Sequence, residues 1–335
     1  MSENKTNMST MALVTKTMPF IIARILTYVI FAVIAFVFLG IMVGIGFLLL
    51  KMFGESAGAF IVVMLIALLV LYGGLRFVER YFLYMVKLGH VSVIVQLLDK
   101  GKVPDGKGMV AYGKDSVVEN FGASNVAFLV DSMVHAAVRQ IQRWIMRIGE
   151  MFRFIPGSQY VMGIISAIMS VSLNYIDEAV MSYVFLQKSK QKEESVWKSA
   201  SDGVTLYAQS WKGVLKTAAI AVVFIYVFTI VVFLVLAFPL MFVSKIIAGD
   251  TEGLGFFLGF LALLGAWILT VLIKRALIDP VVTVMMVRSY QMSIRTLEPA
   301  IDLQQKLLGV SSNFRKLFNK AKDDVADEVP PNVAK

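Results

Sequence analysis

The chain has 335 residues, of which 58% are hydrophobic and 16% are charged, and its formal net charge is +9. A soluble domain carries about a quarter charged residues, so these values exclude an ordinary globular protein. The lack of cysteine excludes disulfides and thiolate-based catalytic or metal sites. The composition therefore predicts an integral membrane protein, and the placement of its basic residues predicts its topology.

The N-terminal part of the sequence predicts a cytoplasmic tail followed by a transmembrane hairpin. Residues 1–17 are polar and lack the short apolar core and cleavage site of a signal peptide. No charged residue occurs from Ile25 to Leu50, and 59–75 is a second apolar run. About 20 helical residues cross a bilayer core, and continuous apolar runs do not fit the alternation of a β-barrel. Residues 18–75 are therefore predicted to form the first transmembrane hairpin.

The segment 76–158 is predicted to be a cytoplasmic, partly amphipathic helical region, because it is rich in Lys and Arg. Its residues 99–115 contain many Gly and Lys and are typical of a solvated loop. Within this loop, "GMVAYGKD" has the glycine and lysine spacing of a phosphate-binding loop. No strand precedes it and Asp115 follows the lysine, so we interpret the match as chance.

From Ser124 to Phe154, apolar residues recur every three or four positions while arginines occupy another face. This pattern predicts a basic amphipathic helix, which either lies along lipid headgroups or packs against other cytoplasmic parts. For the first alternative, the predicted lipid-surface contacts are Arg139, Arg143, Trp144 and Arg147.

Residues 159–185 are apolar but carry the adjacent acids Asp177 and Glu178. A single crossing here would place the lysine-rich segment 186–217 outside, whereas Lys and Arg collect in cytoplasmic loops. We therefore predict that 159–185 is a re-entrant or interfacial helical pair turning near Asn174, and that 186–217 is a basic cytoplasmic segment. A five-span arrangement, in which this segment crosses, and a six-span arrangement, with 122–138 as another crossing, stay open.

The C-terminal part predicts a second hairpin and surface helices. Residues 218–273 contain two apolar runs joined by a short linker, and 274–322 are predicted to be cytoplasmic or surface helices, with an amphipathic helix at 307–322. Residues 323–335 are predicted to be a disordered tail. In each hairpin the second helix ends with basic residues and a partly apolar helix, which suggests a duplication. Two unrelated hairpins are the alternative.

The predicted fold is thus an all-α integral membrane protein. It has two transmembrane helical hairpins, which give four spans, a re-entrant or interfacial helical pair and amphipathic cytoplasmic helices. Both termini are expected in the cytoplasm, and the membrane is expected to be a plasma membrane or a bacterial inner membrane.

The acidic pair is the main functional candidate. A charged group facing lipid costs a few kcal/mol, so both acids are expected to face protein or water. Successive helix positions are about 100° apart, so one acid is expected to line a cavity while the other pairs with a Lys or Arg. We predict a cation or proton site, or alternatively a membrane-surface ion pair. The substrate- or ion-binding residues would be Asn174, Tyr175, Asp177 and Glu178.

Ion pairs are also predicted at the membrane edge, where the second helix of each hairpin leaves the bilayer. Their members are Arg76, Glu79, Arg80, Arg275 and Asp279. The two histidines, His90 and His135, lack the neighbours that a metal site or a serine-type triad requires. We expect no catalytic residues, metal or cofactor, and no nucleic-acid partner.

One stretch of sequence resembles a known family. "NYIDEAVMSY" is followed by "SASDGVTLYAQSWKGVLKTAAIAVVFIYVF", in which Ser199, Ala200, Asp202 and Gly203 precede a basic residue, Lys212 or Lys216, and a long span. With the later "LIKRALIDPVVTVMMV", residues 172–290 resemble the choline transporter-like family. The resemblance implies movement of choline- or ethanolamine-like solutes. Members of that family are longer, and this chain has no counterpart to their N-terminal part.

Two functional hypotheses follow. The first is a small permease or channel subunit for a cation or small organic solute, acting as a homo-oligomer or within a membrane complex, because four spans enclose little volume. The second is a non-transporting membrane scaffold or assembly subunit that binds anionic lipid or a protein partner through its basic amphipathic region. Anionic lipid contributes about 1 kcal/mol per Lys or Arg near the surface.

Overall fold

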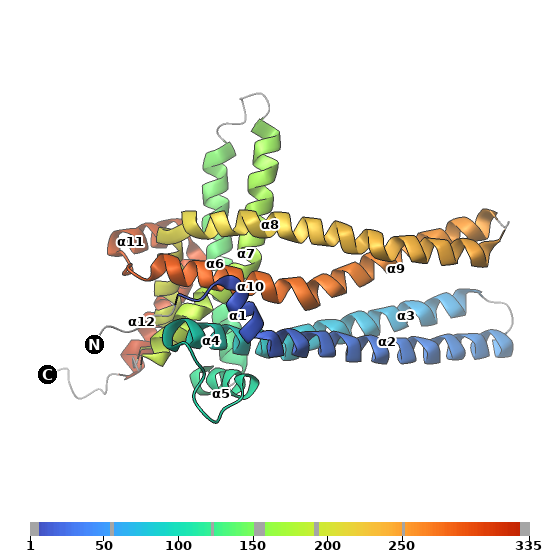
Figure 1. Cartoon of the computed structure of the whole chain (residues 1–335), viewed down its shortest axis with the longest axis horizontal. Coiled ribbons are helices and arrows are strands. Elements are labelled where there is room, and N and C mark those ends of the chain that lie inside the picture. The colour runs from blue at the N-terminus through green and yellow to red at the C-terminus, as the bar shows by residue number, and fades with distance from the viewer. Residues whose placement is uncertain are drawn as a thin grey trace.

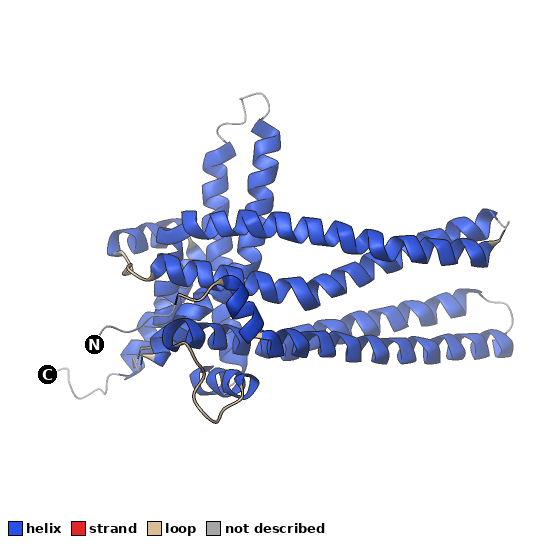
Figure 2. Cartoon of the chain, in the orientation of Figure 1, coloured by secondary structure: helices blue, strands red, loops and turns tan. Residues whose placement is uncertain are grey.

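A computed structural model of the chain describes residues 7–53, 57–121, 124–150, 158–190, 194–249 and 252–328. Within these ranges the chain is helical and contains no strand, as Figure 2 shows. The elements are α1 (Thr10–Lys16), α2 (Met18–Phe53), α3 (Ala57–Phe77), η1 (Val78–Leu83), α4 (Tyr84–Lys100), α5 (Met109–Phe121), α6 (Ser124–Glu150), α7 (Ser158–Ser189), α8 (Val196–Ala248), α9 (Glu252–Ile273), η2 (Lys274–Ile278), α10 (Asp279–Ile294), α11 (Ile301–Val310) and α12 (Ser312–Glu328). The predicted all-α fold class is confirmed for the described residues.

Three helical stretches among the described residues are long and apolar enough to cross a membrane. They are Gly163–Ser189, Val196–Ala248 and Leu258–Ile294. Two bent helix pairs, Thr10–Lys16 with Met18–Ile34 and Met109–Phe121 with Val126–Arg143, raise the number to as many as five. The chain is therefore a helical membrane protein with three to five candidate spans.

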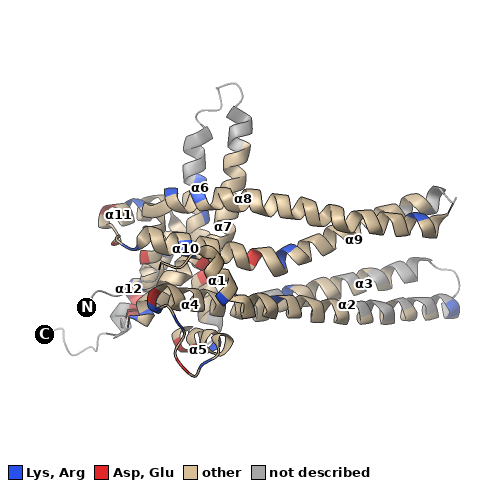
Figure 3. Cartoon of the chain, viewed as in Figure 1, with Lys and Arg blue, Asp and Glu red and all other residues tan. Residues whose placement is uncertain are grey.

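Two long helical hairpins, α2–α3 and α8–α9, project in the same direction from the other helices, which together with the start of α8 form the body of the molecule (Figure 1). Apolar side chains on the hairpins are exposed, and those of Val235 and Phe238 are 65% and 73% accessible. The charged residues lie mainly in the body and at helix ends, as Figure 3 shows. An exposed apolar surface of this length suits contact with lipid hydrocarbon, where helices satisfy their own backbone polar groups.

Each hairpin returns to the body through a π-helical turn. η1 follows α3 and leads into α4, and η2 follows α9 and leads into α10. Such turns are often found at functional sites. The two hairpins therefore share one order of elements, in line with the parallel seen in the sequence, while their duplication stays a prediction.

The body is organised around α7, whose residues from Tyr175 to Phe185 are all buried. Ile176, Val180 and Val184 are fully buried and repeat every four positions, which places them on one helix face. Helices α4, α6, α8 and α10 contact α7. Gly203 lets α8 approach closely, because a Cβ at this position would lie 3.0 Å from a methyl group of Val180.

Helix α7 continues through Asn174 without a break, so the predicted turn near Asn174 is wrong. The prediction treated 159–185 as two helices that pair with each other. In the structure α7 contacts α6, and the two helices lie side by side and extend away from the body (Figure 1). The re-entrant arrangement and the five-span alternative both stay predictions, since Gly163–Ser189 is one of the candidate spans.

Three boundaries differ from the predictions. Helix α5 begins at Met109, inside the predicted loop 99–115. Ser311 divides the predicted helix at 307–322 into α11 and α12, because its backbone is extended and its Oγ accepts a hydrogen bond from the Phe314 N–H at 3.0 Å. Helix α12 reaches Glu328, so the first residues of the predicted disordered tail are helical, and 329–335 lie outside the described residues.

Candidate functional site

Both acids of the predicted site contact one partly buried lysine. The Lys87 Nζ on α4 lies 2.8 Å from the Glu178 Oε1 and 3.2 Å from the Asp177 Oδ2, both on α7. Asp177 and Glu178 are 6% and 3% exposed. We expected that only one of the two acids would pair with a basic residue. A lysine on the neighbouring helix reaches both, because it lies between the directions in which two consecutive residues project.

A third carboxyl group, that of Asp131 on α6, belongs to the same cluster. Tyr84 of α4 donates a hydrogen bond from its hydroxyl to the Ala127 carbonyl at 2.9 Å, which fixes α6 one turn before Asp131. Burial by itself lowers the pKa of Lys87, but the carboxyl groups of Asp177, Glu178 and Asp131 raise it more. The pKa of Lys87 therefore lies above its ordinary value, and the amine stays protonated.

The carboxyl groups of this cluster have unused hydrogen-bonding capacity. Asp131 Oδ1, Asp177 Oδ1 and Glu178 Oε2 are buried, and none of them has a hydrogen-bond partner in the described part of the chain. A buried acceptor without a partner costs about 1–3 kcal/mol. These oxygens can accept a proton, whereas no group of three or more His, Asp or Glu side chains in the described part of the chain is arranged to hold a metal ion. We call Lys87, Asp131, Asp177 and Glu178 the acidic cluster.

Two further polar side chains lie beside the acidic cluster. Arg24, near the start of α2, is 7% exposed, and its charge acts on both Glu178 and His90. His90 on α4 is fully buried and stacks on Phe20 with ring centroids 5.1 Å apart. Burial first, and then the charge of Arg24, lower the pKa of His90 well below its ordinary value, so the ring is neutral at pH 7.

The second hairpin is linked to the site through Tyr175. Its hydroxyl donates a hydrogen bond to the Asp279 Oδ1 at 2.8 Å, and the Lys274 Nζ contacts the same oxygen at 2.8 Å. Asp279 begins α10 directly after η2. Tyr175 therefore joins α7 to the base of the α8–α9 hairpin, whereas its neighbour Asn174, also predicted for the site, is exposed.

The predicted membrane-edge residues lie at the base of the two hairpins. The Arg76 Nε donates a hydrogen bond to the Tyr72 hydroxyl at 3.1 Å, and its guanidinium lies over the Tyr72 ring. Asp279 has Lys274 as an ion-pair partner at 2.8 Å, and its predicted pairing with Arg275 stays a prediction. The side chains of Glu79 and Arg80 lie outside the described part of the structure.

Helix α6 is amphipathic, as predicted, and its first two thirds pack into the body. Val130, Ala137 and Ile141 are buried, whereas Leu129, predicted for the same apolar face, is 48% exposed. Arg139 and Arg143 are exposed. The packing alternative therefore holds for the described side chains of α6, and lipid contact by the arginines stays a prediction. The side chains of Trp144 and Arg147 lie outside the described part.

The sequence pointed to Tyr175, Asp177 and Glu178 but missed their partners. Lys87, Arg24 and His90 are single polar residues in apolar helical sequence, and that isolation was the available signal. A comparison with protein families, curated proteins and solved structures finds no match to the chain. The resemblance to the choline transporter-like family stays a prediction.

Proposed function

We propose that the chain is a small permease or channel subunit that binds a proton or a cation at the acidic cluster. The observation that carries this proposal is the set of buried, unpartnered carboxyl oxygens around Lys87. Buried ionisable groups with specific charge partners are candidates for functional residues. The solute is a cation or a small organic molecule.

The proposed topology has four spans, two in each hairpin, with both termini in the cytoplasm. The excess of Lys and Arg in 76–158 and after residue 273 supports it. So does the shape of the molecule, because α1 and α12, the first and last described helices, lie away from the hairpin tips (Figure 1). In this topology the acidic cluster lies at the cytoplasmic base of the hairpins.

The acidic cluster is connected to both hairpins, so binding of a proton or cation at the cluster can be coupled to the position of the hairpin bases. Arg24 approaches it from α2, and Tyr175 links α7 to Asp279 at the base of α9 and η2. Protonation of Glu178, or binding of a cation, weakens its ion pair with Lys87. Lys87 then shifts toward Asp177, and the forces on α4 and α7, and through them on the hairpin bases, change.

A homo-oligomer is part of this proposal. Among the described residues, the two hairpins contact each other closely only at their bases, where α2 meets η2. Beyond the base, each helix of a hairpin packs against its partner helix, and outward-facing apolar side chains such as those of Val235 and Phe238 are exposed. A solute path enclosed by protein on all sides therefore needs helices from further copies or from a partner subunit.

The proposal is tested by flux through the purified full chain in proteoliposomes, with a pH-sensitive dye for protons and potassium release for cations. We expect Glu178→Gln and Asp177→Asn each to lower the flux at least tenfold, because a neutral amide cannot exchange a proton. Asp115→Asn, which removes an exposed carboxylate paired with Lys107, is the matched control and should leave flux unchanged.

Folding of each variant is checked by size-exclusion chromatography before flux is compared. Glu178→Asp keeps the carboxyl group and should restore part of the flux that Glu178→Gln removes. Unchanged flux in folded Asp177→Asn and Glu178→Gln proteins would remove the cluster from the pathway, and no flux from the parent protein would remove the permease itself.

A second candidate function, a scaffold that binds anionic lipid, has an observation of its own. A crevice of about 240 Å³ opens between α3 and the end of α9. It is lined by Tyr72, Leu75, Arg76, Trp267, Ile268, Val271, Leu272 and Arg275. Two guanidinium groups at the membrane edge suit a phosphate headgroup, and the apolar wall suits an acyl chain.

Native mass spectrometry with phosphatidylglycerol and phosphatidylcholine tests this candidate. The double variant Arg76→Gln and Arg275→Gln should lose retained phosphatidylglycerol and keep the weak phosphatidylcholine signal. Lys245→Gln, at the opposite end of the hairpins, is the control. Equal retention of the two lipids by the parent protein would contradict the lipid site and would leave the flux proposal untouched.

A further inference from the structure

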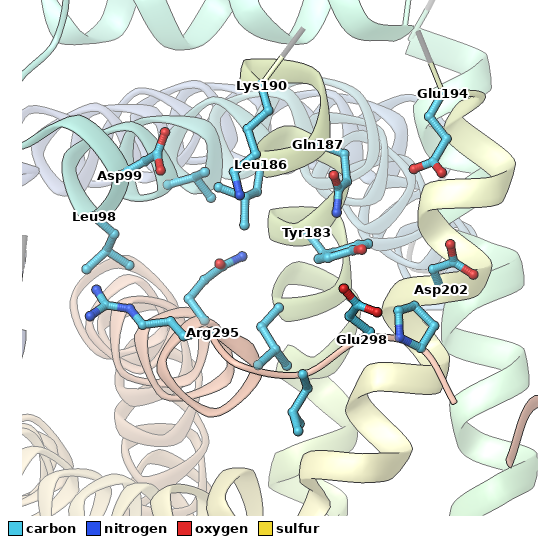
Figure 4. A pocket seen from close by; sticks show the side chains of 15 residues that line it. Leu98, Asp99, Tyr183, Leu186, Gln187, Lys190, Glu194, Asp202, Arg295 and Glu298 are labelled. Carbon is cyan, nitrogen blue, oxygen red and sulfur yellow. The ribbon is translucent and has the colours of Figure 1, made fainter. Parts of the chain in front are cut away.

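A polar cavity of about 390 Å³ lies at the end of the body farthest from the hairpin tips. It is formed where the C-terminal ends of α4, α7 and α10 meet the start of α8, and Figure 4 shows its lining side chains. No residue predicted from the sequence for a site lies in it. The cavity is also separate from the acidic cluster, because Glu178 and Gln187 are nine positions apart on α7, about 14 Å along the helix.

The cavity has an acidic side. Glu194, Asp202 and Glu298 lie there, with the side chains of Tyr183 and Gln187 between them and the opposite wall, which holds Asp99 and Arg295 (Figure 4). Taking all lining residues, four carboxylates stand against two basic side chains, those of Lys190 and Arg295. The lining as a whole is therefore acidic.

Part of this negative charge is already balanced inside the protein. Lys198, one turn before Asp202, pairs with it and lies 3.8 Å from the Glu194 carboxylate. Asp202 also accepts a hydrogen bond from Gln304 at 3.4 Å, and Glu194 accepts one from the Ser199 hydroxyl at 3.2 Å. Glu298 is exposed and lies at the same side of the cavity (Figure 4). It is the carboxylate best placed to meet a ligand entering from solvent.

Gln187 adds an observation that is independent of the charges. Its side chain is directed into the cavity, the residue is only 6% exposed, and its Oε1 has no hydrogen-bond partner among the described residues. Leaving an amide oxygen buried and unpaired is unfavourable, because its hydrogen bond to water is lost. An N–H donor entering the cavity would remove this cost.

We propose that this cavity binds a small primary ammonium compound, with its N–H groups donating to the Gln187 Oε1 and its charge facing the Glu298 and Asp202 carboxylates. A primary ammonium carries three donors and one positive charge. It therefore matches both the unpaired acceptor and the acidic wall, whereas a quaternary ammonium matches the charge alone. The alkyl part contacts Leu186, Ile294 and Leu297, which also line the cavity.

The proposal stands apart from the proposed transport function and is tested by binding, not by flux. Isothermal titration calorimetry on the full chain in detergent uses butylammonium, 1,4-diaminobutane and trimethylbutylammonium as probes. We expect both primary amines to bind and the quaternary compound to bind at least tenfold more weakly, because it cannot donate to the Gln187 Oε1. A tenfold ratio corresponds to about 1.4 kcal/mol.

Two variants locate the binding. Gln187→Met keeps the length of the side chain and removes the acceptor, so it should weaken binding of primary amines about tenfold and leave the quaternary compound unaffected. Glu298→Gln, at an exposed position, keeps the fold and should weaken all three probes. Asp105→Asn, exposed and outside the cavity, is the matched control. Equal affinity for primary and quaternary probes, or affinities unaltered by Glu298→Gln, would overturn the proposal.

Discussion

Helix α8 passes through two regions of the molecule that are stabilised in different ways. In the body, Val204 and Leu206 are fully buried between neighbouring helices. In the hairpin, Leu234 and Val235 are 45% and 65% exposed, although the sequence there is more apolar. Burial in the body depends on protein packing, whereas the hairpin leaves its apolar surface to lipid. Substitutions along this one helix can therefore compare protein packing with lipid contact.

The same contrast applies to charge. The body holds buried acids with a specific partner, as Asp177 and Glu178 have in Lys87. The apolar parts of the hairpins avoid charge, and their basic residues lie at the ends. The body is thus the part in which removal of one polar partner has the largest consequence.

The largest effect is expected from Lys87→Met. This change leaves the buried carboxylates of Asp177 and Glu178 without their cation and should lower the free energy of unfolding by about 3–5 kcal/mol. Urea unfolding in detergent, followed by tryptophan fluorescence, measures it. Lys107→Met is the control, because the exposed Lys107–Asp115 pair is screened by solvent and should contribute nothing measurable.

Adding Asp177→Asn and Glu178→Gln to Lys87→Met tests the electrostatic cause. The triple variant carries no buried charge at these positions and should regain most of the lost stability. A triple variant as unstable as the single one would show that the lysine side chain acts through packing rather than through its charge.

A smaller effect is expected from a pair of leucines on α8. Leu206→Ala creates a cavity in the body and should cost about 2–5 kcal/mol. Leu234→Ala, on the lipid-facing part of the same helix, should change the melting temperature in detergent by no more than about a degree, because lipid or detergent replaces the lost contacts. Equal losses for the two variants would mean that the hairpin is covered by protein, as in a tight oligomer.

The next effect concerns the contact between α4 and α5. A Cβ at Gly113 would lie 2.7 Å from the Gly89 carbonyl oxygen and 2.9 Å from the Phe20 ring. Gly113→Ala should therefore lower the free energy of unfolding by about 1–3 kcal/mol through overpacking. Gly108→Ala is the matched control, since no atom lies within 4 Å of a Cβ there. Thermal unfolding of both variants in detergent gives the comparison.

Local patterns predicted the architecture well and the partners poorly. Charge-free runs of helical length indicated the hairpins, and the three- and four-residue period at 124–154 indicated α6. Gly113 was interpreted as part of a chance phosphate-loop match, and the structure gives it a packing role instead. Steric contacts between helices leave little trace in a single sequence, because any small residue satisfies the local pattern.

The acids of the candidate site could be predicted from the sequence, but their lysine partner could not. Asp177 and Glu178 stand out because charge is rare in apolar sequence, but Lys87 contacts them across 90 positions of the chain. No periodicity records a contact at that distance. The turn near Asn174 was inferred from the lysine-rich segment 186–217, which was expected to stay in the cytoplasm, and it failed because α7 is continuous and α6, from outside that segment, contacts it.

The smallest predicted effect is a gain in stability, whereas the preceding substitutions lower it. Both ring nitrogens of His90 are buried without hydrogen-bond partners in the described part of the chain, so His90→Phe should raise the free energy of unfolding at pH 7.5 by about 1 kcal/mol. The folded pKa of His90 lies well below that of the unfolded chain. The unfolded state therefore takes up a proton as the pH falls below about 6.5, and the stability of the parent protein decreases there.

His90→Phe removes that proton uptake, so its advantage over the parent should grow between pH 7.5 and pH 5.5. The expected growth is about 1.4 kcal/mol, the value of one pH unit below the unfolded pKa. Melting curves in detergent at both pH values measure it, and the exposed Leu129 of α6, which does not titrate, offers a control position. A variant less stable than the parent at pH 7.5 would show that the ring nitrogens bind water or a ligand, and would bring His90 into the chemistry of the acidic cluster beside it.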